Sequence, residues 1–241
     1  MKMLWYKAWL ETRARFLLCL LGTTAICGAF TIRTQAQAMP DTSPWYFASV
    51  NFYAHQYLVG MWLLSAVLLG MGGLVREGAA GTAAFSLALP VSRRAMAGVR
   101  IGCGAVQMVL MGVVPWMAIG GGTLVGGHPL EWDQVGRYLV LLLSGGFVYF
   151  SGSLLVSSLV EGEYTGPAVA MVIVIVSALV PGMVKSWRPF SVIGLMSGGD
   201  LLDKQRYLLR DPFPLLPVGV SLVLTAALLW LSVRAVESRE F

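Results

Sequence analysis

The sequence predicts an all-α integral membrane protein, with six transmembrane helices and an N-terminal interfacial helix in one domain over residues 1–241. Hydrophobic residues make up 57% of the 241 residues and charged residues only 12%, and the mean hydropathy is +0.74. Apolar runs of about 20 residues, the length at which a helix crosses a bilayer, alternate with polar connections. Six such spans use about half of the chain, which leaves no room for a catalytic soluble domain.

Residues 1–15 are predicted to form a helix that lies in the membrane interface. Leu4, Trp5 and Trp9 recur at helical spacing, and lysines and arginines oppose them. Tryptophan side chains favour headgroup depth, where the cations can face lipid phosphates.

The first span is predicted at 16–32, and a cleavable signal peptide is the alternative. A charged start, an apolar run and the small residues around Ala38 are typical of such a peptide. The long amphipathic start contains Glu11, and Arg33 interrupts the approach to the cleavage position. These two charges favour a retained span.

An external loop is expected over 33–55, because Pro40 and Pro44 interrupt it and aromatic residues gather there. The aromatic residues fit a belt at the outer interface, and a lip that contacts substrate is the alternative. Both histidines, His55 and His128, are expected in loops. The second span then follows at 56–75, and its small residues allow close helix approach.

A polar stretch at 76–94 separates the second and third spans, and we expect it on the membrane face within reach of a soluble partner. Arg76 and Glu77 end the second span with charges that hydrocarbon does not tolerate. A short helix is expected over 82–89, where Phe85 and two leucines offer packing. Pro90 stops this helix, and Ser92 can cap the next one.

The third span is predicted at 101–125 and the fourth at 138–160. Gln107 is a rare polar side chain in the third span, and Pro115 should kink that span. Tyr149 and Ser153 belong to a series of hydroxyl side chains in the fourth. All three polar side chains either bond neighbouring helices or line a pathway, and packing is favoured.

The fifth span is predicted at 167–184 and the sixth at 216–236. The connection between them, 185–211, is the longest and is expected outside the membrane. Within it, 201–209 has the pattern of an amphipathic helix.

The distribution of cations places both termini in the cytoplasm. Four cations, Lys2, Lys7, Arg13 and Arg15, precede the first span, against Arg33 alone in the loop that follows. Lysine and arginine accumulate on the cytoplasmic side of membrane proteins, so the chain is expected to be a multi-pass protein of the inner or plasma membrane.

The remaining composition gives no support for metal, nucleic-acid or disulfide chemistry. The three cysteines, Cys19, Cys27 and Cys103, fall in predicted spans without the spacing of a metal site and are interpreted as buried small residues. The net charge of +5 follows from membrane orientation, and no basic cluster with aromatic residues suggests nucleic-acid binding. No catalytic residue and no metal ligand is assigned.

The stretch at 76–94 resembles the loop after the second span of ABC-2 type permeases, the membrane subunits of ABC exporters. That family has a pattern of Glu, Gly-Thr, Leu and Pro-(Val/Ile)-(Ser/Thr)-Arg, which forms a short coupling helix against the ATPase subunit. The residues in the corresponding order here are Glu77, Gly81, Thr82, Leu87, Leu89, Pro90, Val91, Ser92 and Arg93. Small residues at 78–80 stand where many members carry charges.

The resemblance implies a six-span ABC-2 fold of the type V exporter kind, with an interfacial first helix and short re-entrant helices within 185–211. It implies that two copies, or one copy and a related subunit, form the pathway in the lipid bilayer. It also implies separate ABC ATPase subunits that bind ATP and Mg²⁺, with no cofactor in this chain. The coupling residues are then Glu77, Gly81, Thr82, Phe85, Leu87, Leu89, Pro90 and Arg93, and the pathway candidates are Gln107, Tyr149 and Ser153.

The sequence argues against three other functions and leaves a fourth open. Leu143-Ser144-Gly145-Gly146 spells the start of the ABC ATPase signature, but it lies within an apolar span and no phosphate-binding motif accompanies it. An intramembrane enzyme is disfavoured because both histidines are expected in loops. A secondary carrier would need ionisable groups at mid-membrane. A non-transporting membrane anchor stays open, and it would not need the loop at 76–94.

Overall fold

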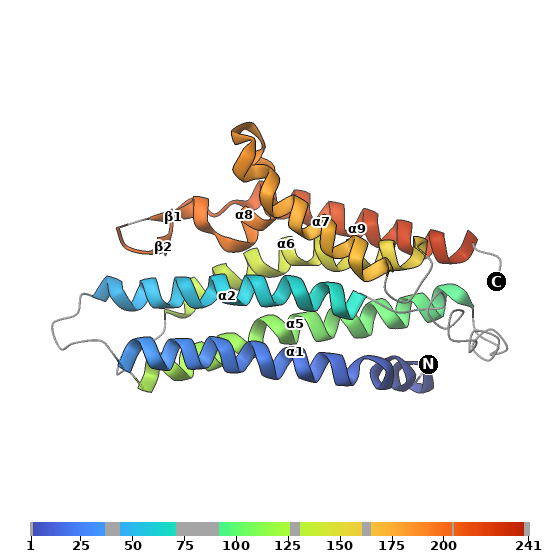
Figure 1. The fold of residues 1–241 in the computed structure, drawn as a ribbon, viewed down its shortest axis with the longest axis horizontal. Helices are drawn as coiled ribbons and strands as arrows, with labels where there is room; N and C mark the ends of the chain where they lie inside the picture. The colour runs from blue at the N-terminus through green and yellow to red at the C-terminus, as the bar shows by residue number, and fades with distance from the viewer. Residues whose placement is uncertain are drawn as a thin grey trace.

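The computed structural model describes residues 2–36, 44–70, 92–125, 131–160, 165–203 and 205–238. Within these ranges five helices are long and apolar enough to cross a membrane, and a sixth apolar helix, α7, is shorter. The helices lie side by side along one axis, and both chain termini lie at the same end (Figure 1). We call this end the terminal end and the opposite one the far end.

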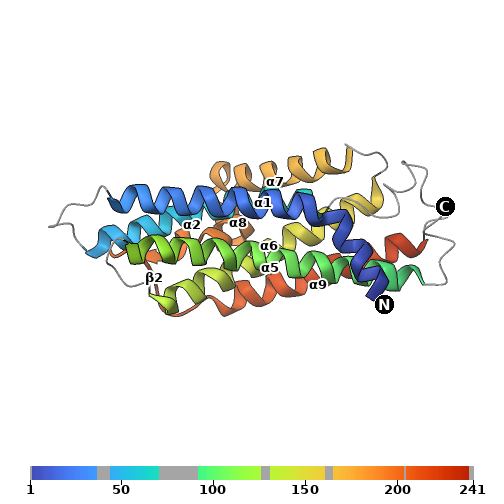
Figure 2. The same ribbon diagram turned by 90° about the horizontal axis from the view of Figure 1, so that it is seen from below.

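The first helix, α1 (Lys2–Ala36), is continuous over 35 residues and joins the segments predicted separately as 1–15 and 16–32. Neither glycine nor proline lies near the expected boundary, so nothing in the sequence ends the helix there. The helix bends towards its N-terminus (Figure 2). There Trp5 lies over Gly102 of another helix, where an added Cβ would come within 2.9 Å of the indole.

The second helix, α2 (Pro44–Gly70), begins twelve residues before the predicted start of the second span. Proline suits the first turn of a helix, so Pro44 begins a helix here and does not interrupt a loop. Buried side chains recur at helical spacing well before residue 56, at Phe47, Val50 and Ala54. The prediction of a loop for 44–55, and of a loop position for His55, is therefore wrong.

Three further long helices complete the bundle, with a shorter helix, α7 (Thr165–Met183), beside them. They are α5 (Arg93–Val125), α6 (Trp132–Leu159) and α9 (Leu215–Ser238). Helix α5 starts eight residues and α6 six residues earlier than predicted. Contacts of Trp5 with Gly102 and of Thr31 with Gly122 show that α1 and α5 run in the same direction.

A compact unit between α7 and α9 covers part of the bundle. It contains η1 (Lys185–Phe190), α8 (Val192–Ser197), η2 (Gly199–Leu201), β1 (Leu202–Asp203) and β2 (Leu208–Leu209). The strands pair antiparallel, with Leu202 opposite Leu209. The amphipathic helix predicted for 201–209 is therefore wrong. The backbone carbonyl of Asp203 accepts from the Tyr207 amide at 2.7 Å, and Tyr207 has the positive φ of 57° that closes the turn.

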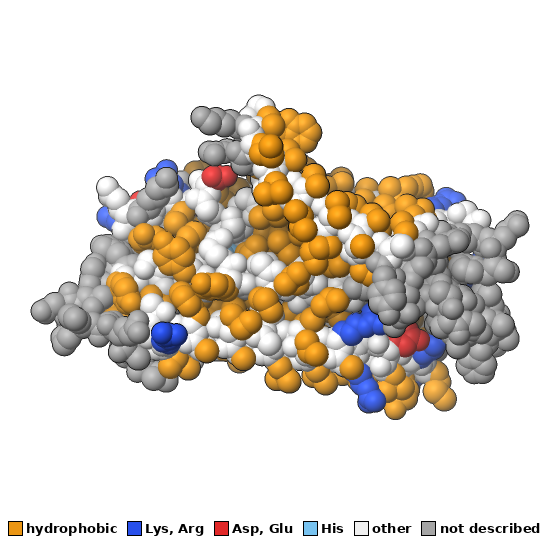
Figure 3. All heavy atoms as spheres, viewed as in Figure 1, with side chains coloured by type: hydrophobic (Ala, Val, Ile, Leu, Met, Phe, Trp, Pro, Cys, Tyr) orange, Lys and Arg blue, Asp and Glu red, His pale blue; other side chains and the backbone are white. Residues whose placement is uncertain are grey.

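The core lies between α2, α5 and α6. Trp62, Met108, Met111, Leu141 and Phe150 are each at most 1% exposed. On the face shown in Figure 3, apolar side chains cover much of the middle, while lysine and arginine gather towards the two ends. This is the surface expected of a bundle with a hydrocarbon belt and two aqueous ends. The three cysteines are free and buried, as predicted.

Candidate functional site

The stretch predicted to carry the coupling residues joins two helices at the terminal end. Its residues 71–91 lie outside the described ranges, so most of the predicted coupling residues do too. These are Glu77, Gly81, Thr82, Phe85, Leu87, Leu89 and Pro90. The flanks are described: α2 ends at Gly70 and α5 begins at Arg93. These two flanks lie at the terminal end of the bundle (Figure 1).

Ser92 caps the helix that follows the loop, as the sequence predicts. Its Oγ accepts a hydrogen bond from the Ala95 amide at 3.2 Å, and its carbonyl accepts from the Met96 amide. This is the usual way in which a serine satisfies the first amides of a helix. The cap sets where α5 begins, and it places Arg93 and Arg94 in the first turn.

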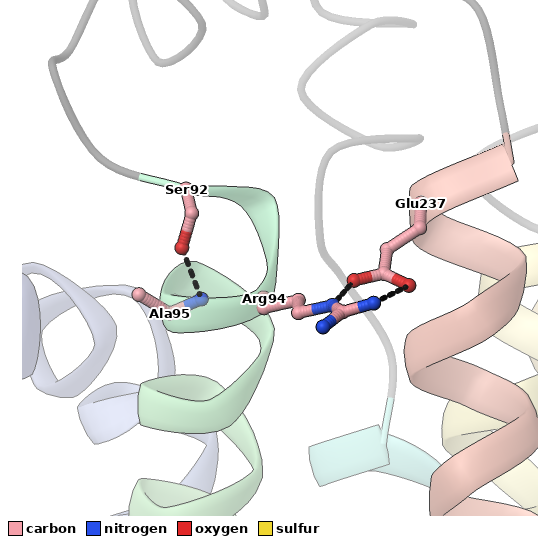
Figure 4. A network of polar contacts seen from close by, with 4 residues as sticks. All are labelled: Ser92, Arg94, Ala95 and Glu237. Carbon is pink, nitrogen blue, oxygen red and sulfur yellow. Dashed lines mark hydrogen bonds and ion pairs between the residues drawn. The ribbon is translucent and has the colours of Figure 1, made fainter.

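Arg94 ties this start of α5 to the end of α9. Its guanidinium forms a two-pronged ion pair with the Glu237 carboxylate, through Nε to Oε1 and through Nη2 to Oε2 at 3.2 Å (Figure 4). Two parallel bonds between a guanidinium and a carboxylate fix the relative orientation of the two groups in addition to attracting them. The pair is more exposed on the arginine side, 69% against 21% for the glutamate.

Charge reversal at this ion pair tests whether it holds the two helix ends together. Arg94→Glu and Glu237→Arg should each destabilise the solubilised chain slightly, by less than about 1 kcal/mol, because solvent screens an exposed pair. The double exchange should restore the wild-type melting temperature. If the double variant is destabilised by the sum of the two single destabilisations, the two side chains do not interact.

The three pathway candidates all make contacts between helices. Gln107 Nε2 donates to Thr12 Oγ1 at 2.7 Å, which joins α5 to α1. The Tyr149 hydroxyl and Ser177 Oγ lie 2.9 Å apart between α6 and α7. Ser153 Oγ donates to the Val67 carbonyl at 3.2 Å, which joins α6 to α2. Each bond connects a different pair of helices, so the three do not meet at one contact.

The same side chains are almost completely buried within this chain. Gln107 is 1% exposed, Ser153 4% and Tyr149 8%. Polar side chains that bond across helices hold a membrane bundle together without the hydrophobic driving force that acts in water. The contacts therefore support packing, and a role for these residues in a pathway stays a prediction.

The Leu143-Ser144-Gly145-Gly146 segment has a packing role in α6. An added Cβ at Gly146 would come within 2.5 Å of the Trp62 ring, and one at Gly145 within 2.5 Å of the Met196 side chain. Because these positions have no side chain, α2 packs closely on α6 at Gly146, and α8 packs closely on α6 at Gly145. This is a local use of small residues at helix crossings.

Sequence reasoning missed a pair of bonds that hold α8 against α2. The His55 ring donates from Nε2 to the Met196 carbonyl at 2.9 Å, and Gln56 Nε2 donates to the Ser197 carbonyl at 2.9 Å. Both acceptors are at the C-terminal end of α8, where carbonyls lack helical partners. We call these two bonds the α8 latch. The sequence contains a signal for a longer α2 that would include His55, because the helical spacing of apolar residues extends back to Phe47.

Two contacts from the first turns of α6 secure the rest of the unit. Gln134 Oε1 accepts from the Leu209 amide at 3.1 Å. Arg137 bonds Asp211 at 2.7 Å and also pairs with Asp133 of its own helix at 2.9 Å. The unit between α7 and α9 is thus attached to α2 through the latch and to α6 through Gln134 and Arg137.

The chain matches one known protein family over most of its length. A family model described as "ABC-2 family transporter protein" matches residues 18–199. The chain belongs to the ABC-2 transporter family. No match was found among curated proteins or among solved structures. The matched range begins in α1 and ends in η2, so it contains both flanks of the 71–91 loop and the α8 latch.

Membership of the ABC-2 transporter family and the apolar helices together make the chain a multi-pass membrane protein and a component of membrane transport. The resemblance read from the sequence is therefore confirmed at the level of the family. In the part of the chain that the structure describes, no group of three or more His, Cys, Asp or Glu side chains lies close enough to hold a metal ion.

Proposed function

We propose that the chain is the membrane-spanning permease subunit of an ATP-driven ABC-2 exporter. The observation that carries this proposal is the family match over 18–199, which covers most of the described bundle. Six helices would cross the membrane, with α7 (Thr165–Met183) as the shortest. Both termini and the 71–91 loop would face the cytoplasm, and the membrane would be the inner or plasma membrane.

The free energy for transport would come from separate ABC ATPase subunits that bind ATP and Mg²⁺. The segment from Glu77 to Arg93 would dock on such a subunit, with Phe85, Leu87 and Leu89 as its apolar contacts. The loop that contains this segment connects Gly70, the last residue of α2, to the capped start of α5. Movement of a docked ATPase would therefore act on α2 and α5 together.

The pathway would form between two copies of the chain, or between one copy and a related subunit. The described core of this chain is filled by its own side chains, among them Trp62, Phe150 and Met108. Many large apolar side chains remain exposed on α7 and α9, including Ile173, Val176 and Val223. A second subunit and lipid would share these surfaces.

The decisive experiment combines co-purification with ATP hydrolysis. The solubilised chain is expected to bind its ATPase partner and to change its rate of ATP hydrolysis. Replacing Leu87 and Leu89 by Asp should weaken binding on the order of a hundredfold, because two carboxylates would be placed in an apolar contact. Glu77→Arg should weaken binding as well.

The matched control is Gln205→Ala, which changes an exposed side chain in the turn between β1 and β2. It should bind and stimulate the ATPase like the wild type. A chain that binds no ATPase, with loop variants that behave like the control, would favour a non-transporting membrane anchor.

A further inference from the structure

A cluster of three aromatic rings lies in the bundle beside α8. His55 of α2, Trp116 of α5 and Tyr138 of α6 are at most 3% exposed. The His55 ring lies 4.6 Å from Tyr138 and 5.7 Å from Trp116, measured between ring centroids. Trp116 and Tyr138 are stacked, with centroids 5.7 Å apart and ring planes 23° from parallel.

Each of these rings carries a buried polar atom that lacks a partner. The atoms are His55 Nδ1, Trp116 Nε1 and the Tyr138 hydroxyl oxygen, and none has a hydrogen-bond partner among the described residues. The large majority of buried polar side-chain atoms in proteins are paired. Other buried polar atoms of the described bundle are also unpaired, but these three stand on neighbouring rings and can therefore share one partner.

The hydrogen-bonding roles of the three atoms are complementary. His55 Nε2 faces the Met196 carbonyl at 2.9 Å, and a carbonyl can only accept, so the ring proton is on Nε2. In the neutral ring Nδ1 is then an acceptor. Trp116 Nε1 can only donate, and the tyrosine hydroxyl can do both. A single group that both accepts and donates would satisfy the set.

The backbone beside Trp116 adds a further acceptor. Pro115 lies inside α5 and has no N–H, so the carbonyl of Met111 cannot receive the usual helical bond from position 115. Met111 is completely buried. One backbone carbonyl in the turns before Trp116 therefore lacks its usual helical donor.

We propose that His55, Trp116 and Tyr138 form a binding site for one hydroxyl oxygen. The oxygen accepts from Trp116 Nε1 and donates to His55 Nδ1, and the Tyr138 hydroxyl takes the remaining position. It belongs either to a water molecule, which commonly makes about three bonds when buried, or to the hydroxyl group of a transported molecule. The second source rests on the proposed export function, and the first does not.

The chain contains a matched control for two of the three residues. Trp62 is also completely buried, but its Nε1 donates to the Met108 carbonyl at 3.2 Å. Tyr149 is 8% exposed, and its hydroxyl is bonded to Ser177. These residues have the same chemistry in the same bundle and differ in having a partner.

The first measurement is the NMR signal of the indole N–H groups in the full-length, ¹⁵N-labelled chain in detergent. Trp116→Phe and Trp62→Phe identify the two signals. We expect a cross-peak between the Trp116 indole proton and water, and none for Trp62. Addition of 4-fluorophenol, an aromatic hydroxyl probe, distinguishes the sources. A saturable shift of the Trp116 signal with loss of the water cross-peak indicates a site that accepts the hydroxyl of a larger molecule.

The second measurement is thermal stability, which does not depend on assigning signals. Removal of a bonded hydroxyl destabilises a fold, whereas removal of an unpaired buried hydroxyl does not. Tyr138→Phe should therefore lower the melting temperature as Tyr149→Phe does, without any addition if the oxygen belongs to water, and in the presence of saturating 4-fluorophenol if it belongs to a larger molecule. The proposal is overturned if Tyr138→Phe leaves the melting temperature unchanged or raises it both with and without 4-fluorophenol. It is equally overturned if Trp116 shows neither the water cross-peak nor a phenol shift.

Discussion

Gly146→Ala is expected to destabilise the bundle by about 1–3 kcal/mol, although alanine is the better helix former. The new methyl group would lie 2.5 Å from two carbons of the Trp62 ring. The ring is completely buried and its Nε1 is held by the Met108 carbonyl, so it has no free direction in which to move. Denaturation of the solubilised chain, followed by tryptophan fluorescence, measures the loss.

The control lies on the same helix. An added Cβ at Gly152 would meet no atom within 4 Å, so Gly152→Ala should be neutral or stabilising by up to about 1 kcal/mol. Trp62→Phe shortens the opposing ring and should reduce the cost of Gly146→Ala. Equal costs of Gly146→Ala in the two backgrounds would show that the contact with Trp62 is not the cause.

Removal of the α8 latch is expected to release the unit between α7 and α9 from α2. His55→Ala with Gln56→Ala removes both bonds to the carbonyls of Met196 and Ser197. Two hydrogen bonds contribute about 1–3 kcal/mol net, so local opening should become on the order of ten- to a hundredfold more frequent. Hydrogen exchange of the Leu209 and Arg210 amides measures this opening.

The same exchange experiment has an internal reference. Amides in the centre of α6, such as those of Leu141 and Leu142, are completely buried and should exchange as in the wild type. Gln205→Ala, which changes an exposed side chain of the same unit, should not alter exchange. Unchanged exchange at Leu209 in the latch variant would show that Gln134 and Arg137 hold the unit without help from α2.

The long apolar helices could be predicted from the sequence because hydrocarbon permits only a few backbone structures, and apolar runs of bilayer length mark them. Helix ends were harder to predict. The sequence predicts a loop interrupted by Pro44, whereas Pro44 begins α2, because a proline in a first helical turn costs no hydrogen bond. The same residue type therefore marks either a break or a start, depending on its neighbours.

The unit that contains α8 could not be predicted in detail. Its short elements are stabilised by partners far away in sequence, such as His55, Gln56 and Gln134, and not by local propensity. The pattern at 201–209 fits a helix, but a single turn closed by Tyr207 in a left-handed conformation makes a hairpin. Tertiary contacts decided between the two, and no local pattern reports such contacts.

At the candidate site, the sequence identified the capping role of Ser92 but did not find the cluster of His55, Trp116 and Tyr138. The cap is a local interaction over three residues and can be read from the chain. The cluster joins three helices from positions more than 20 residues apart in sequence. A loop over 44–55 would place His55 outside the helices, so the predicted loop and the cluster exclude one another.

The unbroken length of α2 has a mechanical consequence. Gly70, where the 71–91 loop begins, and His55, which holds α8, are fifteen residues apart on one helix and therefore about 22 Å apart along its axis. The stretch between them contains no proline, and Trp62 and Ser65 are embedded in neighbouring helices. Because an unbroken helix moves largely as one body, a shift of α2 at Gly70 would also displace the latch that holds α8.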